Sequence, residues 1–432
     1  MDDFEAACPE ARGQPPGAAF GATSPTGKFP CDTRVFAVFC GPVTKTPEAP
    51  SIRQPEASSA PFLRRLILRD YRNFERLECE FPEAGVAIIG PNGSGKTNLL
   101  EAIYYLEVFR SFRGVRDQAI VRFGQTVFRV EGEVEGGMSV AAAYDRSQRI
   151  KKVEVDALEV ERVSAGIGSV GVAAFRLDDA EIVRGGPTLR RRFLDVALSV
   201  GVPGYLPALQ RYRGLLSQRN EALRRGRSND EIEAWTEGLI EAGGILTEGR
   251  AEWVLEGAER YADFYARISG GDRAGLRYSA SVASDDGAEG PEGAGSWEDR
   301  FRHALERTGE RERRQGMTIV GPHRDEIRFE VEAPEGPRDL RSYGSSGQQR
   351  TAALALRLLE ADRLRERLGR EPLYLLDDVF AELDEGRSGR LFRLFESERG
   401  GQVILTAPKS GDVGLMGGKL ARWRLRNGRL IA

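Results

Sequence analysis

A glycine-rich segment constrains the fold of this chain more than any other feature. Eight consecutive residues match the phosphate-binding loop pattern G-x-x-x-x-G-K-[ST] at every fixed position: Gly90, Pro91, Asn92, Gly93, Ser94, Gly95, Lys96 and Thr97. The apolar run from Val86 to Ile89 precedes the loop, and apolar residues at helical spacing follow it. These flanks predict a strand, a loop and a helix, and they disfavour a glycine-rich turn that binds nothing.

The residue types in this loop suit a polyphosphate ligand. Glycines let the backbone turn tightly and approach the phosphates, whose charge is held by backbone N–H groups at a helix N-terminus. Lys96 adds a positive charge for the β and γ phosphates, and the Thr97 hydroxyl is a ligand for a nucleotide-bound Mg²⁺. The loop therefore predicts ATP and Mg²⁺ as cofactors.

A second segment near the C-terminus supplies carboxylates. Leu373 to Leu376 form an apolar strand that ends in Asp377 and Asp378. A carboxylate at the end of such a strand reaches Mg²⁺ at the open edge of the sheet, so Asp377 is the predicted metal ligand. Asp378 is placed to polarise an attacking water. A paired or solvated aspartate after a buried strand remains the alternative for each residue.

Composition excludes several classes of site and location. The 432 residues are 40% hydrophobic, and no apolar run approaches the roughly 18 residues of a membrane helix. The N-terminus lacks the charged-then-apolar order of a signal peptide, which predicts a cytoplasmic protein with no membrane partner. Four cysteines without a C-x-x-C pair and only two histidines disfavour disulfides and Cys or His metal sites.

Changes in character along the chain predict its domains. Residues 1–60 hold nine of the 21 prolines and no periodicity, so we expect either a disordered extension or a wrongly assigned start. Residues 61–188 and 315–432 alternate strands and helices, as an α/β ATPase lobe requires. Residues 189–314 show the period of long helices and predict an inserted helical lobe, with a low-complexity acidic loop at 284–296.

Further motifs resemble those of a known family. Ser345, Ser346, Gly347 and Gln348 open a predicted helix and look like the signature motif of ABC-type ATPases. Taken with Arg69–Phe74, Gly186–Asp195, Gln218–Asn220, Gly321–Asp325 and Gly347–Leu356, the match is to the RecF family, from about Phe62 to the C-terminus. The resemblance implies an α/β fold: a P-loop ABC-type ATPase head with a mixed sheet, an antiparallel β meander and an inserted helical lobe.

The resemblance also implies a function. RecF proteins are bacterial recombinational-repair ATPases that resemble an SMC head without its coiled coil. A RecF-like chain would form an ATP-dependent homodimer on double-stranded DNA, favouring junctions with single-stranded gaps, and would work with RecR and RecO to load RecA. Carried over by position, Ser345, Gly347 and Gln348 would contact nucleotide held by the partner subunit, and Lys96, Asp378 and Ser345 would be the catalytic residues.

Two departures from the ABC pattern imply slow hydrolysis, which suits a switch. Asp378 stands where many ABC ATPases carry glutamate, and Thr406-Ala407 stands where many carry a histidine. The Q-loop residue is uncertain, with Asp178 as the candidate. His323 and Asp325 could sense nucleotide or hold the two lobes together, and the structural role is favoured because a lone histidine is more often a satisfied structural group.

Charge is unevenly distributed along the predicted helical lobe. The net charge is −3, but residues 189–228 hold nine arginines against two acids, and residues 229–259 hold nine acids against one arginine. The candidate DNA contacts are Arg190, Arg191, Arg224, Arg225 and Arg227. A solvated helix face is the alternative for this block.

Two other functions remain possible at this level. One is a P-loop ATPase of the transport or signalling type without a DNA role, which the lack of membrane segments and the arginine block disfavour. The other is a nucleotide-binding scaffold that never hydrolyses ATP, which a single-turnover ATP assay separates from an enzyme.

Overall fold

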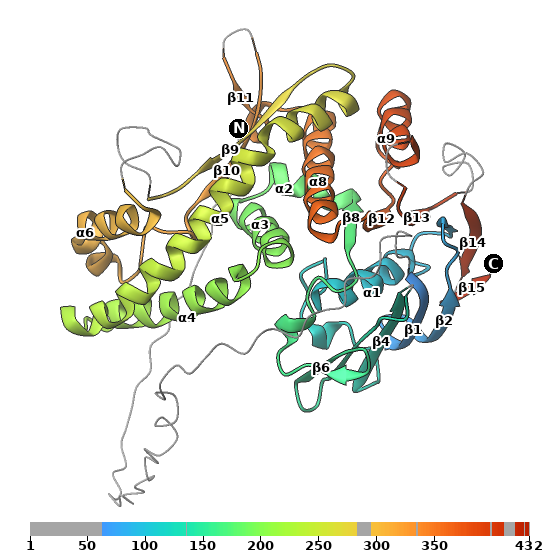
Figure 1. Ribbon diagram of the computed structural model, residues 1–432, viewed down its shortest axis with the longest axis horizontal. Helices are drawn as coiled ribbons and strands as arrows, with labels where there is room; N and C mark the ends of the chain where they lie inside the picture. The colour runs from blue at the N-terminus through green and yellow to red at the C-terminus, as the bar shows by residue number, and fades with distance from the viewer. Residues whose placement is uncertain are drawn as a thin grey trace, which may run out of the picture. The chain divides into compact units, whose positions relative to one another are not determined.

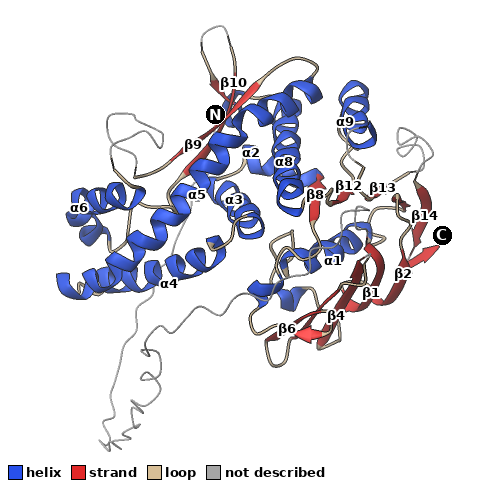
Figure 2. Cartoon of the chain, viewed as in Figure 1, coloured by secondary structure: helices blue, strands red, loops and turns tan. Residues whose placement is uncertain are grey.

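The computed structural model of the chain has an α/β fold in which several sheets are covered by helices (Figures 1 and 2). Residues 57–432 form one compact unit. The predicted extension at 1–60 and most of the predicted acidic loop at 284–296 lie outside the described residues. The structure describes residues 63–134, 136–282, 295–333, 336–397, 400–409, 420–426 and 428–431.

An antiparallel sheet forms the predicted meander. Leu66 and Leu68 of its strand β1 are buried because alternate residues of a strand point to the same face. Strand β1 pairs with β2 through the turn at Tyr71–Phe74 and with β4 on its other side. In spatial order the strands are β2 (Phe74–Glu80), β1 (Leu63–Tyr71), β4 (Val127–Val134), β5 (Ser139–Asp145), β6 (Ile150–Val155) and β7 (Leu158–Glu159).

A mixed sheet carries the phosphate-binding loop. Its strands β3, β12 and β13 are buried along their whole length, which explains their continuous apolar runs. All neighbours are parallel except the C-terminal pair β14 and β15. In spatial order the strands are β15 (Arg429–Ile431), β14 (Ala421–Arg426), β3 (Gly85–Ile89), β13 (Val403–Ala407), β12 (Leu373–Asp377) and β8 (Val172–Arg176).

Helix α1 (Lys96–Val108) packs between these two sheets. Leu99, Leu100 and Ile103 are fully buried there and join a core that contains residues of both sheets. The helix ends at Val108, because Phe109 takes a left-handed conformation. The short elements around this core are η1 (Asp117–Ala119), η2 (Val163–Gly166), η3 (Leu177–Asp179) and α2 (Ala180–Arg184).

Long helices fill the range where the sequence predicts a helical lobe (Figure 1). The longest, α5, begins at a capping box of Ser228 and Glu231 and packs against α4, α6 and α8. A Cβ at Gly257 of α5 would lie 2.8 Å from Leu359 Cδ2, so glycine permits the close approach of α5 to α8. The helices are α3 (Pro187–Gly201), α4 (Tyr205–Arg224), α5 (Asn229–Ser269), α6 (Trp297–Gln315), α7 (Leu340–Tyr343), α8 (Ser346–Leu368) and α9 (Glu385–Ser397).

A small third sheet crosses the predicted boundary of the helical lobe. Strand β9 (Ala274–Ser279) pairs antiparallel with β10 (Glu326–Val331), which pairs with β11 (Arg338–Asp339). Backbone hydrogen bonds therefore join the range 189–314 to the range 315–432. The division into an ATPase lobe and a helical lobe remains a prediction. Within the described ranges, no helix is both long enough and apolar enough to cross a membrane.

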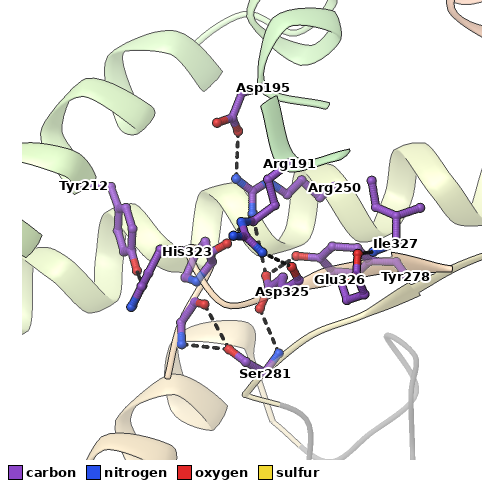
Figure 3. A network of polar contacts seen from close by, with 12 residues as sticks. Arg191, Asp195, Tyr212, Arg250, Tyr278, Ser281, His323, Asp325, Glu326 and Ile327 are labelled. Carbon is purple, nitrogen blue, oxygen red and sulfur yellow. Dashed lines mark hydrogen bonds and ion pairs between the residues drawn. The ribbon is translucent and has the colours of Figure 1, made fainter. Parts of the chain in front are cut away.

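A buried polar network lies beside this sheet (Figure 3). The Asp325 carboxylate accepts hydrogen bonds from the Tyr278 hydroxyl and from the backbone N–H of Ser281, the latter at 2.8 Å. Arg250 donates to Asp195 at 2.7 Å and to the carbonyl of Pro322 at 2.7 Å. Burial raises the pKa of Asp325. These contacts support the structural role favoured for the Gly321–Asp325 segment.

His323 belongs to the same network and is neutral. Its Nε2 lies 3.0 Å from the carbonyl of Thr318, which can only accept, so Nε2 carries the hydrogen. Its Nδ1 therefore accepts from the Tyr212 hydroxyl at 2.7 Å. Burial lowers the pKa of His323 to about 4.

We expect the protonation of His323 to contribute to acid destabilisation. Its pKa is about 4 in the native state and 6.5 ordinarily, so the unfolded chain binds more protons and stability falls as pH drops through this range. The loss between pH 7 and pH 5 is about 2 kcal/mol. His323→Gln keeps one donor and one acceptor but does not titrate. Urea unfolding at both pH values should show a smaller pH-dependent loss in the variant, and equal losses would contradict this assignment.

Candidate nucleotide-binding site

The phosphate-binding loop connects β3 to α1, as the sequence predicts. The N–H of Gly90 donates to the carbonyl of Ala407 in β13 at 3.2 Å, and the N–H of Ser94 closes a turn onto Pro91 at 3.2 Å. Helix α1 begins at Lys96 without a side-chain cap, because its N-cap is Gly95. The first N–H groups of a helix have no intrahelical partner, so this terminus suits a phosphate.

Two glycines of the loop are required by its geometry. Gly95 has a φ of 106°, and a Cβ there would lie 2.5 Å from the Asn73 amide. A Cβ at Gly90 would lie 2.5 Å from the carbonyl oxygen of Leu425 in β14. A side chain at either position would shift the loop, so the backbone path depends on glycine.

Lys96 lies folded over its own loop. The side chain is buried, and Nζ donates to the carbonyls of Gly90 at 2.9 Å and Pro91 at 3.4 Å. Its ammonium group is therefore held at the concave side of the loop by weak acceptors. A phosphate oxygen is a stronger, charged acceptor for the same hydrogens.

Thr97 and Asp377 meet although they are 280 positions apart. The Thr97 hydroxyl lies 3.0 Å from Asp377 Oδ1, and the Thr406 hydroxyl lies 2.9 Å from the same atom. Pairing of β12 with β13 and of β13 with β3 brings these residues to one edge of the mixed sheet. The two halves of the site, the loop helix and the acidic strand, are thus joined by a single carboxylate oxygen.

The oxygen atoms of Thr97 and Asp377 fit a magnesium ion. Mg²⁺ is commonly held in proteins by one or two carboxylate or hydroxyl oxygens together with waters and substrate phosphates. Burial raises the pKa of Asp377, whereas the hydrogen bonds from Thr406 and Thr97 act to lower it. A divalent cation would favour the charged carboxylate and offset that burial. When bound, the ion would neutralise charge on the phosphates.

Asp378 occupies an unusual backbone conformation next to this pair. Its φ is 51°, in the left-handed region, which aspartate adopts more readily than most residues. Its N–H donates to the Thr406 hydroxyl oxygen at 3.1 Å. Its side chain is half-buried, whereas that of Asp377 is buried. The two carboxylates therefore differ in their exposure to solvent.

Three side chains of the site were not singled out from the sequence. Thr406 contacts both aspartates, although the sequence analysis treated it only as the absence of a histidine. Asn73 donates to the carbonyl of Ser94 at 3.4 Å and accepts from Asn98 at 2.7 Å. The Arg69–Phe74 motif was the available signal for Asn73. Its spacing alone does not reveal that the β1–β2 turn lies against the loop.

The signature segment is formed, and its Ser345 and Ser346 are exposed. Ser345 caps α8: its Oγ accepts from the N–H of Gln348 at 3.2 Å, and Gln348 Oε1 accepts from the N–H of Ser345 at 2.9 Å. Gly347 is half-buried against Arg387. In the described part of the chain, no hydrogen bond or ion pair joins residues 345–348 to residues 90–97.

Asp178, the Q-loop candidate, is exposed, while its neighbour Asp179 is buried at the end of η3, the turn that follows β8. Asp179 accepts two hydrogen bonds from Arg357 of α8, at 2.8 and 3.0 Å. This ion pair connects the signature helix to the mixed sheet. Asp179 was not among the site residues predicted from the sequence.

The predicted DNA contacts divide into two groups. Arg190 is buried and donates to Glu326 at 2.6 and 2.8 Å and to three backbone carbonyls, so we leave it out of a DNA surface. Arg191 is half-buried and donates to the carbonyl of Asp325 at 2.8 Å. Arg224, Arg225 and Arg227 have side chains 61%, 62% and 50% exposed and form local ion pairs with Glu221 or Glu231.

Comparison with known proteins identifies similar chains. The profile described as RecF/RecN/SMC N terminal domain matches residues 62–424. The chain is 36% identical to the DNA replication and repair protein RecF of Halalkalibacterium halodurans over 343 residues, 77% of this chain and 90% of the relative. It is 32% identical to RecF of Bacillus subtilis over 378 residues, 86% of this chain and 100% of the relative.

Solved structures agree with these relatives. The RecF–ATP structure of the recombination mediator protein in the RecFOR pathway superposes with a TM-score of 0.76 at 27% identity. The match covers 87% of this chain and 99% of that one. The predicted fold class, an ABC-type ATPase head with a mixed sheet and an antiparallel meander, is confirmed.

The different surroundings of the two aspartates lead to a testable division of roles. Asp377→Asn should weaken Mg²⁺-dependent ATP binding by about tenfold or more, because it removes the charged ligand. Asp378→Asn should leave ATP affinity within about twofold and slow turnover by about 10²-fold or more. Titration with Mg²⁺-ATP and a single-turnover assay measure the two effects. Identical behaviour of the two variants would contradict the division.

Proposed function

Because the chain belongs to the RecF family of DNA replication and repair proteins, we propose that it is a recombinational-repair ATPase whose nucleotide cycle controls its hold on DNA. The observation that carries this proposal is the meeting of Thr97, Asp377 and Thr406 at the mouth of the phosphate-binding loop. This arrangement supports the proposal, because it brings a phosphate-binding loop and candidate metal ligands together within one chain. Family membership leaves no support for the alternative interpretation, a transport or signalling ATPase without a DNA role.

ATP and Mg²⁺ are the proposed cofactors. The uncapped N-terminus of α1 and the Lys96 ammonium group would hold the phosphates, and Thr97 and Asp377 would hold the metal. Asp378 would orient and deprotonate the attacking water. An aspartate has a shorter reach than the glutamate of many ABC ATPases, and Thr406 cannot exchange a proton as histidine does at neutral pH. Hydrolysis is therefore proposed to be slow. By family resemblance, it is also proposed to depend on DNA.

An ATP-dependent homodimer is the proposed active form. Ser345 of the signature segment is exposed, its hydroxyl oxygen accepts a capping hydrogen bond, and the hydrogen of that hydroxyl can still be donated. By family resemblance, this segment would complete the nucleotide site of a second copy. ATP would then hold two copies together, and hydrolysis would release them.

The proposed nucleic-acid partner is double-stranded DNA beside single-stranded gaps. Arg224, Arg225 and Arg227 lie at the end of α4 and in the turn after it, and they are solvent-exposed. Their ion pairs with Glu221 and Glu231 are surface pairs, which contribute little and can exchange for phosphates. By family membership, RecR and RecO are the proposed protein partners in the loading of RecA.

Reversing the exposed arginines should weaken DNA binding without sequence preference. Arg224→Glu, Arg225→Glu and Arg227→Glu together should lower the slope of log affinity against log salt by about one for each phosphate that the protein no longer neutralises. Arg64→Glu, Arg76→Glu and Arg328→Glu change the same charge on exposed strand positions and serve as the control. Gel-shift titrations at several salt concentrations measure both sets. An unchanged slope in the first set would contradict the DNA contacts and favour the alternative, in which these arginines form a solvated helix face.

The composite site makes a prediction about mixed subunits. Ser345→Arg should spare ATP binding by a single chain but prevent closure of the dimer, whereas Lys96→Ala should lose ATP binding. A heterodimer of the two variants contains one site with an intact loop and an intact signature. Mixing the two inactive proteins should therefore restore measurable DNA-dependent ATP hydrolysis. If Ser345→Arg alone hydrolyses ATP and dimerises like the wild type, the composite-site mechanism is wrong.

A further inference from the structure

A cavity lined by basic side chains lies apart from the nucleotide site. Its volume is about 890 Å³, and none of residues 90–97 lines it. The segment after α1 and the β5–β6 hairpin contribute Arg110, Arg116 and Arg149, whereas α3 and α4 contribute Arg191, Arg192 and Arg213. Positively charged side chains from segments distant in sequence therefore line the same cavity.

The cavity also borders the buried network of Figure 3. Arg250, Tyr212 and His323 belong to that network and line the cavity. Arg250 is buried and fixed by Asp195 and the carbonyl of Pro322. Arg191 is held by the carbonyl of Asp325 at 2.8 Å. This side of the cavity is thus built from side chains that the fold holds in place.

Acidic side chains do not balance the charge of the cavity. Eight Lys or Arg side chains and two aspartates line it. Asp117 pairs with Lys151 at 2.7 Å, and Asp195 is shared by Arg250 at 2.7 Å and Arg213 at 2.9 Å. Within the described ranges, no carboxylate forms an ion pair with four further arginines of the cavity, Arg110, Arg116, Arg149 and Arg192.

The positively charged side chains of the cavity affect the pKa of Arg191. Burial and the neighbouring Arg250 lower the pKa of this side chain, which in most surroundings is always charged. An anion inside the cavity would remove that penalty. Guanidinium groups that line one cavity suit phosphate oxygens, because each presents several donors in a planar fork.

We propose that this cavity is a second anion site, which binds the phosphate groups of a nucleotide-sized ligand. Its volume is in the range of small-molecule sites, roughly 300–1,000 Å³. The same chemistry can come from a free polyphosphate or from a short stretch of a single DNA strand. None of residues 90–97 lines this site, so its binding can be measured in a variant whose phosphate-binding loop is inactive.

The test uses the full chain with Lys96→Ala, which removes phosphate binding at the loop. The probes are inorganic tripolyphosphate and an oligothymidylate that has no terminal phosphate. Binding of each probe is measured by titration calorimetry at low salt without nucleotide. We expect at least one probe to bind. Arg116→Gln, Arg149→Gln and Arg192→Gln together should weaken that binding by about tenfold or more. The matched control, Arg64→Gln, Arg76→Gln and Arg328→Gln, should change it by less than about twofold.

The two probes separate the sources of phosphate. If only tripolyphosphate binds, a free polyphosphate is the ligand of the cavity. If the oligonucleotide binds and tripolyphosphate displaces it, a DNA strand is the ligand. If neither probe binds, or if both triple variants weaken binding equally, the proposal is overturned. Neither result bears on ATP binding by the wild-type loop, which is measured separately.

A measurement without cavity substitutions covers the case in which the triple variant does not fold. Phenylglyoxal modifies exposed arginines, and mass spectrometry locates the products. A saturating concentration of the bound probe should slow modification of Arg116 and Arg149 by about fivefold or more, while Arg76, on the antiparallel sheet, reacts at an unchanged rate. Equal rates with and without the probe at all three positions would overturn the proposal.

Discussion

The nucleotide site depends on one buried carboxylate oxygen that accepts from two hydroxyl groups. Asp377 Oδ1 lies 3.0 Å from the Thr97 hydroxyl and 2.9 Å from that of Thr406. These hydrogen bonds join the start of α1 to the ends of β12 and β13. Burial raises the pKa of Asp377, so the charged form is held at a cost that the hydroxyl donors offset only in part. A site with this imbalance favours a bound cation.

The same edge of the sheet positions the signature helix. Asp179 follows β8, which pairs with β12, and it binds Arg357 of α8 through two hydrogen bonds. The Arg357 guanidinium also lies over the Phe193 ring of α3, 5.1 Å from its centroid. Helix α8 is therefore fixed to the mixed sheet by a buried ion pair and to the helical region by an aromatic contact. A buried pair of this kind holds α8 in place, because moving the helix away would leave the buried Asp179 carboxylate without its compensating charge.

Local patterns of the sequence predicted the elements of the site, and pairing between distant segments decided its details. The glycine pattern predicted the strand, loop and helix around residues 90–97, and the apolar run before Asp377 predicted a strand that ends in two carboxylates. The sequence did not reveal that Thr406 would contact Asp377, because a threonine after a buried strand has no pattern of its own. It also did not reveal the pairing of β9 with β10, since residues 280–325 separate the two strands in the chain and a short strand has no pattern that identifies its partner.

The arginine block at 189–228 shows why a charge count does not define a surface. Successive residues of a helix point in directions about 100° apart, so neighbouring arginines reach different surroundings. Arg190 is buried against Glu326, while Arg191 and Arg192 line the basic cavity. Arg219 is buried in an ion pair with Glu312 at 2.7 Å, and Arg224 is exposed at the end of its helix. One run of positive charge thus supplies structural pairs, a cavity wall and an exposed surface, and only the position of each guanidinium assigns it to one of them.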